Sequence, residues 1–198
     1  MEFSAHYYKA IARFDAANTA DSNIETVDCH SYPKELLYAQ RMTGWLSKYQ
    51  PDASEVLHLA ARAQHICRWK IPRSQYPMGR VGYNDWRTRL AKMHGELATE
   101  IMREVGYDDL MCERVRKLLM KDRMEAGEGE GQILEDVICL VFLEFYFVPF
   151  APQHSEQKLA GIVRKTWRKM SERAKQTALT LAPLWPPELL AIVKKAVE

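Results

Sequence analysis

The sequence predicts an all-α protein, a single domain of about seven or eight helices bundled around one central apolar helix. Apolar residues recur at spacings of three and four along most of the 198 residues, which is the period of an amphipathic helix. Prolines, glycines and other turn formers separate these stretches, and no stretch shows the alternation of a strand. A composition of 47% hydrophobic and 27% charged residues is that of an ordinary globular domain, here residues 1–198.

The first two helices are separated by a segment rich in turn formers. Residues 3–17 place four large apolar side chains on one helical face, which should pack inward. Residues 18–33 contain many turn formers, and Pro33 stands where a helix can begin. A second helix is therefore expected from residue 34 to about residue 49.

The next two helices flank a loop. Asp52 or Ser54 can cap a third helix that reaches Trp69. Two prolines and two glycines forbid regular structure from about residue 70 to 82. Asn84 can cap a fourth helix, which a glycine then ends.

The second half of the chain contains the predicted central helix. Asp108 can begin a fifth helix, and residues 125–131, EAGEGEG, are expected to form a flexible acidic connector. Residues 132–148 are apolar nearly all round and precede Pro149, which is typical of a helix surrounded by others. Further helices are expected over residues 156–170, after Ser171, and from the proline pair at 186 and 187.

Nothing in the sequence indicates a membrane or a secreted protein. The longest apolar run, residues 137–151, is interrupted by Glu144 and Pro149 and is shorter than the ~20 residues that cross a bilayer. The first residues do not resemble a signal peptide, and the four cysteines match neither a zinc motif nor a disulfide scaffold. A cytoplasmic location without membrane contact is the expectation.

Positive charge is concentrated in one segment rich in aromatic residues. Residues 62–89 contain seven Arg or Lys and a single acidic residue, although the net charge of the whole chain is only +2. Guanidinium groups bind phosphate or carboxylate in a bidentate manner, and aromatic rings can stack on a base. An anionic small molecule or a nucleotide is the expected partner, with RNA as a possibility; alternatively, these arginines form salt bridges to neighbouring helices. The candidate substrate-binding residues are Arg62, Arg68, Trp69, Arg73, Tyr76, Arg80, Tyr83 and Arg87.

Histidines in the third and fourth helices are candidates for chemistry. His58, Arg62, His65 and Trp69 follow at helical spacing, so the third helix is expected to carry one polar stripe. His94 borders the core-facing side of the fourth helix. The alternative for each histidine is a hydrogen-bonded side chain with a purely structural role.

Carboxylates inside apolar surroundings complete the candidate set. Glu135, Asp136 and Glu144 lie in the predicted central helix, where a buried carboxylate is costly unless it is paired or bound to a metal. The first two lie near the helix start, where the helix dipole also favours an acid, and so does Glu35 in the second helix. Glu144 lacks that explanation, so we expect either a buried salt bridge or a catalytic role with His65.

Four strings carry a resemblance that covers most of the chain. They resemble an uncharacterised domain-of-unknown-function family of small helical proteins, which has no established activity. The strings are ELLYAQRM at 35–42, QHICRWKIPRSQYPMGRVGYNDWRTRL at 64–90, LEDVICLVFLE at 134–144 and KTWRKM at 165–170.

The layout is also similar, more distantly, to the HD superfamily of metal-dependent phosphohydrolases. This resemblance implies a divalent metal, Fe, Mn, Zn or Ni, held by His65, His94, Asp136 or the adjacent Glu135, and Glu35. The residue after His65 is Ile66, where that superfamily has an Asp. A site with one metal fits these residues better than a binuclear site, and a pocket that has lost its metal fits them equally well.

These observations lead to three hypotheses about function. The first is an HD-like, metal-dependent hydrolase that acts on a phosphorylated small molecule or nucleotide, with His65 and Glu144 as candidate catalytic residues. The second is a non-catalytic module that binds a nucleotide or RNA through the same basic segment. The third is metal-free acid–base catalysis by His65 with Glu144 or Glu135. The resemblance also implies an HD-like iron oxygenase, as an oxidative variant of the first hypothesis.

Overall fold

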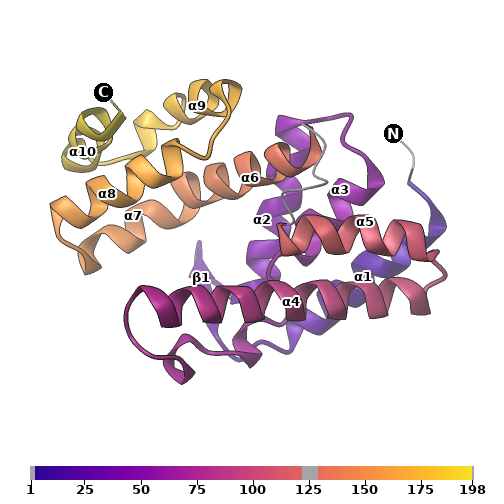
Figure 1. Cartoon of the computed structure of the whole chain (residues 1–198). Coiled ribbons are helices and arrows are strands. Elements are labelled where there is room, and N and C mark those ends of the chain that lie inside the picture. The colour runs from indigo at the N-terminus through magenta and orange to yellow at the C-terminus, as the bar shows by residue number, and fades with distance from the viewer. Residues whose placement is uncertain (1–2, 122–128, 198) are drawn as a thin grey trace. The chain divides into compact units, whose positions relative to one another are not determined.

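The computed structural model describes residues 3–121 and 129–197. The described residues form ten α-helices and one two-stranded sheet, which confirms the all-α class (Figure 1). Most of the predicted acidic connector at 125–131 lies outside the described residues. Contacts between residues divide the chain into two compact units, the first up to Gly131 and the second from Gln132.

Two helices of the first unit begin where the sequence predicts N-terminal caps. Ser54 and Asp108 each accept a hydrogen bond from the backbone three residues later, as N-cap residues do. Helices α1, α2, α3 and α5 contact one another or α4, so that one core forms between them. The elements of this unit are α1 (Ala5–Thr19), β1 (Ile24–Val27), β2 (His30–Pro33), α2 (Lys34–Tyr49), α3 (Glu55–Ala63), η1 (Arg68–Lys70), η2 (Arg73–Gln75), α4 (Arg80–Glu104) and α5 (Asp109–Met120).

The prediction that the chain contains no strand is wrong for a short hairpin before α2. β1 and β2 pair antiparallel, with Val27 opposite His30. Asp28 and Cys29 form the two-residue turn between them, and both have positive φ angles of 49° and 63°. Two consecutive residues in the left-handed conformation form the type of turn that matches the twist of a hairpin. Such turns usually contain a glycine, and neither Asp28 nor Cys29 is one, so the sequence did not indicate the turn.

The predicted third helix ends six residues earlier than expected. α3 stops at Ala63, and turns follow in which the backbone N–H of Ile66 bonds to Ala63 and that of Arg68 to His65. Cys67 then adopts a left-handed conformation with φ 53°, which no α-helix can contain. The predicted stripe is therefore broken: His58 lies in α3, whereas His65 lies in the turn beyond it.

α4 and α5 form an antiparallel helical hairpin (Figure 1). The chain turns between them at Gly106, whose φ of 104° is accessible mainly to glycine. At its other end α4 begins at Arg80, four residues before the predicted cap Asn84. Gly82 permits this earlier start because a Cβ there would lie 2.1 Å from the carbonyl oxygen of Pro77.

In the second unit the predicted apolar helix is built from three consecutive helical segments. Val137, Leu140 and Val141 of its first segment are fully buried, as expected. Pro149 cannot donate to the carbonyl four residues earlier, and a widened π turn directly precedes the segment that contains it. The elements are α6 (Glu130–Val141), η3 (Phe142–Tyr146), α7 (Phe147–Phe150), η4 (Ala151–Gln153), α8 (Glu156–Trp167), α9 (Glu172–Leu179), η5 (Ala182–Leu184) and α10 (Pro187–Val197).

Trp185 attaches the C-terminal part of the second unit to this apolar helix. Its indole N–H donates to the carbonyl of Leu143 over 3.0 Å, and its ring packs edge-on against Phe147. α8 and α10 pack against each other, and Ser171 caps α9 as predicted. Among the described residues no helix combines the length and the apolar character needed to cross a membrane.

Gly82→Ala is expected to destabilise the first unit, because the new methyl group would overlap the backbone of Pro77. We expect a loss of about 1–3 kcal/mol in the free energy of unfolding, measured by urea denaturation. Gly44→Ala is the matched control: Gly44 is an exposed glycine of α2 with nothing within 4 Å of a Cβ. This control should gain about 0.5–1 kcal/mol from helix propensity, and equal effects of the two changes would contradict the close approach at Gly82.

Candidate functional site

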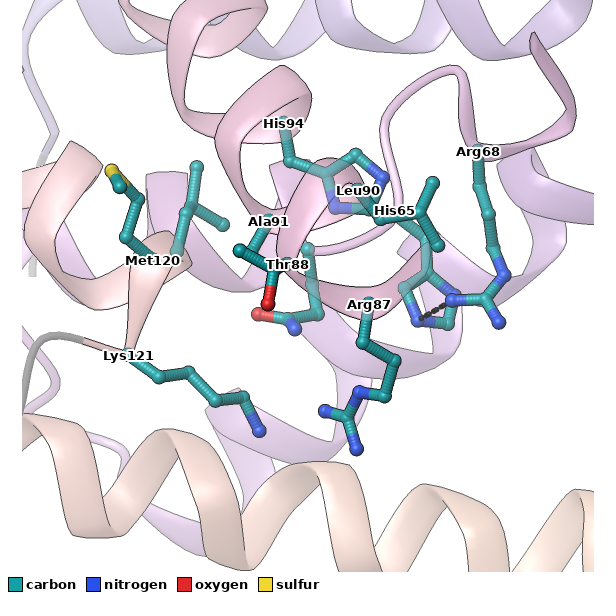
Figure 2. Close-up of a pocket in the computed structure, with 11 residues that line it drawn as sticks. His65, Arg68, Arg87, Thr88, Leu90, Ala91, His94, Met120 and Lys121 are labelled. Carbon is teal, nitrogen blue, oxygen red and sulfur yellow. Dashed lines mark hydrogen bonds between the residues drawn. The ribbon is translucent and has the colours of Figure 1, made fainter. Parts of the chain in front are cut away.

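A pocket of about 200 Å³ lies within the first unit, where the turn after α3 meets α4 and the end of α5 (Figure 2). It brings together two predicted candidates that are far apart in the sequence, His65 and His94. It also contains two of the predicted arginines, Arg68 and Arg87. The remaining lining residues are Gln64, Thr88, Leu90, Ala91, Leu119, Met120 and Lys121.

His65 is held in one orientation by contacts on both ring nitrogens and on one face. Its Nδ1 lies 3.1 Å from Oε2 of Glu35, and its Nε2 lies 3.1 Å from a guanidinium nitrogen of Arg68. Because a guanidinium can only donate, Nε2 must accept, and the ring proton is therefore on Nδ1, where it is donated to Glu35. Tyr38 stacks on the ring with 3.9 Å between centroids and an interplanar angle of 13°.

The backbone of Glu35 is fixed by two buried side chains. Its N–H donates to Oδ2 of Asp21 over 3.1 Å, and its carbonyl accepts from Nδ2 of Asn18 over 3.4 Å. Oδ1 of the same Asn18 accepts the backbone N–H of Cys67 over 2.9 Å. One fully buried amide therefore sets both the start of α2 and the turn that carries His65.

Burial shifts the ionisation of all three central groups toward their neutral forms. Desolvation raises the pKa of Glu35 to about 7, although the nearby Arg68 opposes the shift. Burial, followed by the charges of Arg68 and Arg87, lowers the pKa of His65 well below its usual value. The pKa of His94 is lowered too, by burial and then by His65 and Arg68. Both imidazoles are thus neutral at pH 7, and Glu35 is close to its titration midpoint.

Three cationic side chains surround these neutral groups. Arg68 stacks over the ring of Trp86, with 4.6 Å from its Cζ to the centroid, and its Nε is 3.8 Å from Glu35. Arg87 projects from α4 and Lys121 from the end of α5. In Figure 2 the charged ends of Arg87 and Lys121 lie toward the same side of the pocket. The arrangement suits a ligand with negative charge.

Lys121 is a lining residue that the sequence reasoning missed, although a signal was present. In a helical hairpin that turns near Gly106, residues equally distant from the turn face each other, which places residue 121 beside Ala91. A Cβ on Gly95 would lie 3.1 Å from Cγ of Arg116 and 3.5 Å from Cγ of Met120, in agreement with this register. Gln64 and Thr88 carried no comparable signal.

Two lining residues contain buried polar atoms without a hydrogen-bond partner in the described part of the chain. These atoms are Nε2 of His94 and Oε1 of Gln64. His94 is 4% exposed and Gln64 is 8% exposed. The rings of His94 and His65 are 6.0 Å apart between centroids. A buried polar atom without a partner is uncommon and often marks the place of a ligand or water.

Several predicted binding residues have other contacts. Arg62 forms a bidentate ion pair with Asp15, with distances of 2.7 and 2.6 Å, and so connects α3 to α1. Arg73 donates to the carbonyls of Tyr76 and Pro77 and so stabilises its own loop. Four further predicted residues do not line this pocket: Trp69, Tyr76, Arg80 and Tyr83.

The predicted carboxylates of the central helix belong to the second unit. Asp136 accepts hydrogen bonds from the backbone N–H and the hydroxyl of Ser171, over 2.8 and 2.5 Å, and so anchors the start of α9. Glu135 pairs with Lys169 over 3.1 Å. Glu144 is partly exposed in the π turn. Within residues 3–121 and 129–197, no three His, Cys, Asp or Glu side chains are grouped closely enough to hold a metal ion.

Fold and site define a small all-helical protein with a cationic pocket, in which one lining histidine, His65, is paired with the buried Glu35. The chain belongs to the DUF4202 family, a domain of unknown function, whose model matches residues 8–193. No curated protein and no solved structure matches the chain. The similarity to the HD superfamily therefore stays a prediction.

Glu35→Gln is expected to change how stability depends on pH. The folded state holds a proton on Glu35 up to about pH 7, whereas the unfolded chain releases it near 4.5, so the contribution of Glu35 to stability falls as pH rises through this window. The stability of Glu35→Gln relative to the parent protein should therefore increase from pH 5 to pH 8. Urea denaturation at each pH measures this difference. Parallel pH profiles for the two proteins would contradict the burial of an ionisable carboxyl at this position.

Proposed function

We propose that the pocket binds an anionic, phosphorylated small molecule or nucleotide and that the protein hydrolyses its phosphoester. The observation that carries this proposal is the gathering of Arg68, Arg87 and Lys121 around the neutral imidazole of His65. Arginine offers paired donors in the geometry of a phosphate, and lysine adds a third positive charge. None of the described residues that line the pocket is acidic, and burial raises the pKa of the neighbouring Glu35 to about 7.

His65 is suited to act as a general base on a water molecule. Its Nε2 carries no proton, and its lone pair accepts a hydrogen bond from Arg68. When a phosphate attracts Arg68, Nε2 becomes available to take a proton from water as the oxygen attacks phosphorus. The P–O bond to the alcohol then breaks, and the imidazolium returns the proton to the departing oxygen. Glu35 at Nδ1 stabilises the imidazolium between these steps.

A metal-dependent form of this reaction is a second candidate, favoured by one observation. Nε2 of His94 is buried without a partner in the described chain, and His94 lines the same pocket as His65. These two imidazoles would hold the ion, and Glu35 already occupies the place of an outer carboxylate that orients a ligating histidine. A divalent ion such as Fe, Mn, Zn or Ni would supply a bound water of lowered pKa.

Anion binding is tested with the double variant Arg87→Gln, Lys121→Asn, in which asparagine tolerates the left-handed backbone of residue 121. We expect inorganic phosphate and adenosine monophosphate to bind at least tenfold more weakly, because each charged hydrogen bond contributes about 1.5–3 kcal/mol. Isothermal titration calorimetry measures the affinities. Arg89→Gln is the matched control, an exposed arginine of α4 that does not line the pocket. Equal affinities in all three proteins would exclude this pocket as the anion site.

Turnover is tested by phosphate release from a panel of phosphorylated metabolites and nucleotides. His65→Gln should lower the rate by about 100-fold or more, the usual contribution of a general base, and Glu35→Gln should have a smaller effect. Arg89→Gln should retain the full rate. If release requires added metal, bound metal measured by elemental analysis should fall in His65→Gln and His94→Gln together. Binding without release would instead favour the non-catalytic module, and a steep loss of affinity with salt would favour RNA as its ligand.

A further inference from the structure

The lining of the pocket changes from charged and exposed to neutral and buried. Arg87 and Thr88 are exposed residues of α4, whereas His94, two turns further along the same helix, is 4% exposed. Gln64 is buried as well, directly after α3. A ligand that fills the pocket therefore meets cations on one side and neutral polar groups on the other.

The neutral side has hydrogen-bonding capacity that the described chain does not use. Oε1 of Gln64 and Nε2 of His94 both lack a partner there. Leaving such a group buried and unpaired is costly, so a molecule that pairs with both atoms gains affinity by doing so. The backbone of Gln64 is held by a bond to the carbonyl of Ala61, but its side chain is long enough to adjust to a ligand.

The chemistry of these two atoms selects the group that can pair with them. A carboxamide oxygen needs a donor, which excludes a phosphate dianion at that point. A ligand ammonium would be repelled by Arg68 and Arg87. A hydroxyl is neutral and both donates and accepts, so it satisfies Gln64 and also His94 in either of its neutral tautomers.

The size of the pocket limits the ligand. The pocket offers a volume of about 200 Å³. This is room for a phosphate group with a short carbon chain. Resting on the proposed function, we infer that the pocket takes a short phosphorylated polyol, with its phosphate near Arg87 and Lys121 and its hydroxyls near Gln64 and His94.

Two ligands of equal charge and carbon number test this inference. Glycerol 1-phosphate carries two hydroxyls that n-propyl phosphate lacks, so only the former can pair with the buried groups. By isothermal titration calorimetry the parent protein should bind glycerol phosphate about tenfold or more tightly than propyl phosphate. Gln64→Met, which keeps the side-chain length without its amide, should remove most of this preference. Its affinity for inorganic phosphate should be unchanged, which shows that the variant is folded.

The outcomes separate this inference from the proposed function. If glycerol phosphate and propyl phosphate bind equally well, the polyol inference is overturned and phosphate binding stands. A preference that persists unchanged in both Gln64→Met and His94→Phe, at unchanged phosphate affinity, also overturns it. If the parent protein binds neither inorganic phosphate nor either ester, the proposed function is wrong, and the polyol inference is overturned with it.

Discussion

The buried amide of Asn18 is the interaction on which the rest of the site depends. Its oxygen accepts the N–H of Cys67, and its nitrogen donates to the carbonyl of Glu35, so a residue of α1 connects the start of α2 with the turn after α3. A fully buried side chain of this kind has no water to replace its partners. The two backbone segments are therefore fixed relative to each other, and the separation of His65 from Glu35 is fixed with them.

This constraint explains why α3 ends where it does. The left-handed conformation of Cys67 costs energy in a residue with a side chain, and the hydrogen bond from its N–H to Asn18 helps to offset that cost. Ending α3 at Ala63 releases His65 from the helix surface and turns it toward Glu35 and Tyr38. In a continuous helix His65 would instead lie on the same stripe as His58, whose ring lies beside Phe3 and Tyr7.

The parts of the fold that follow local rules could be predicted from the sequence. Capping residues such as Ser54 and Asp108 act on the next turn of their own helix, so the helix starts were readable. The left-handed turn at Cys67 was not, because it depends on Asn18, which lies 49 residues earlier. The local pattern did not indicate the pairing of Glu35 with His65, because an acid in the first turn of a helix has an ordinary explanation in the dipole. Only the resemblance to the HD superfamily placed these two residues in one site.

The charges around the pocket explain why the basicity of His65 would increase when an anionic ligand binds. In the free protein burial acts most strongly against a positive imidazole, and the charges of Arg68, Arg87 and Lys121 add to this effect. A bound phosphate would offset these charges and attract Arg68 away from Nε2, so the pKa of His65 would rise toward the range of a useful base. Ligand charge and base strength are thus coupled through Arg68, which contacts both members of the pair.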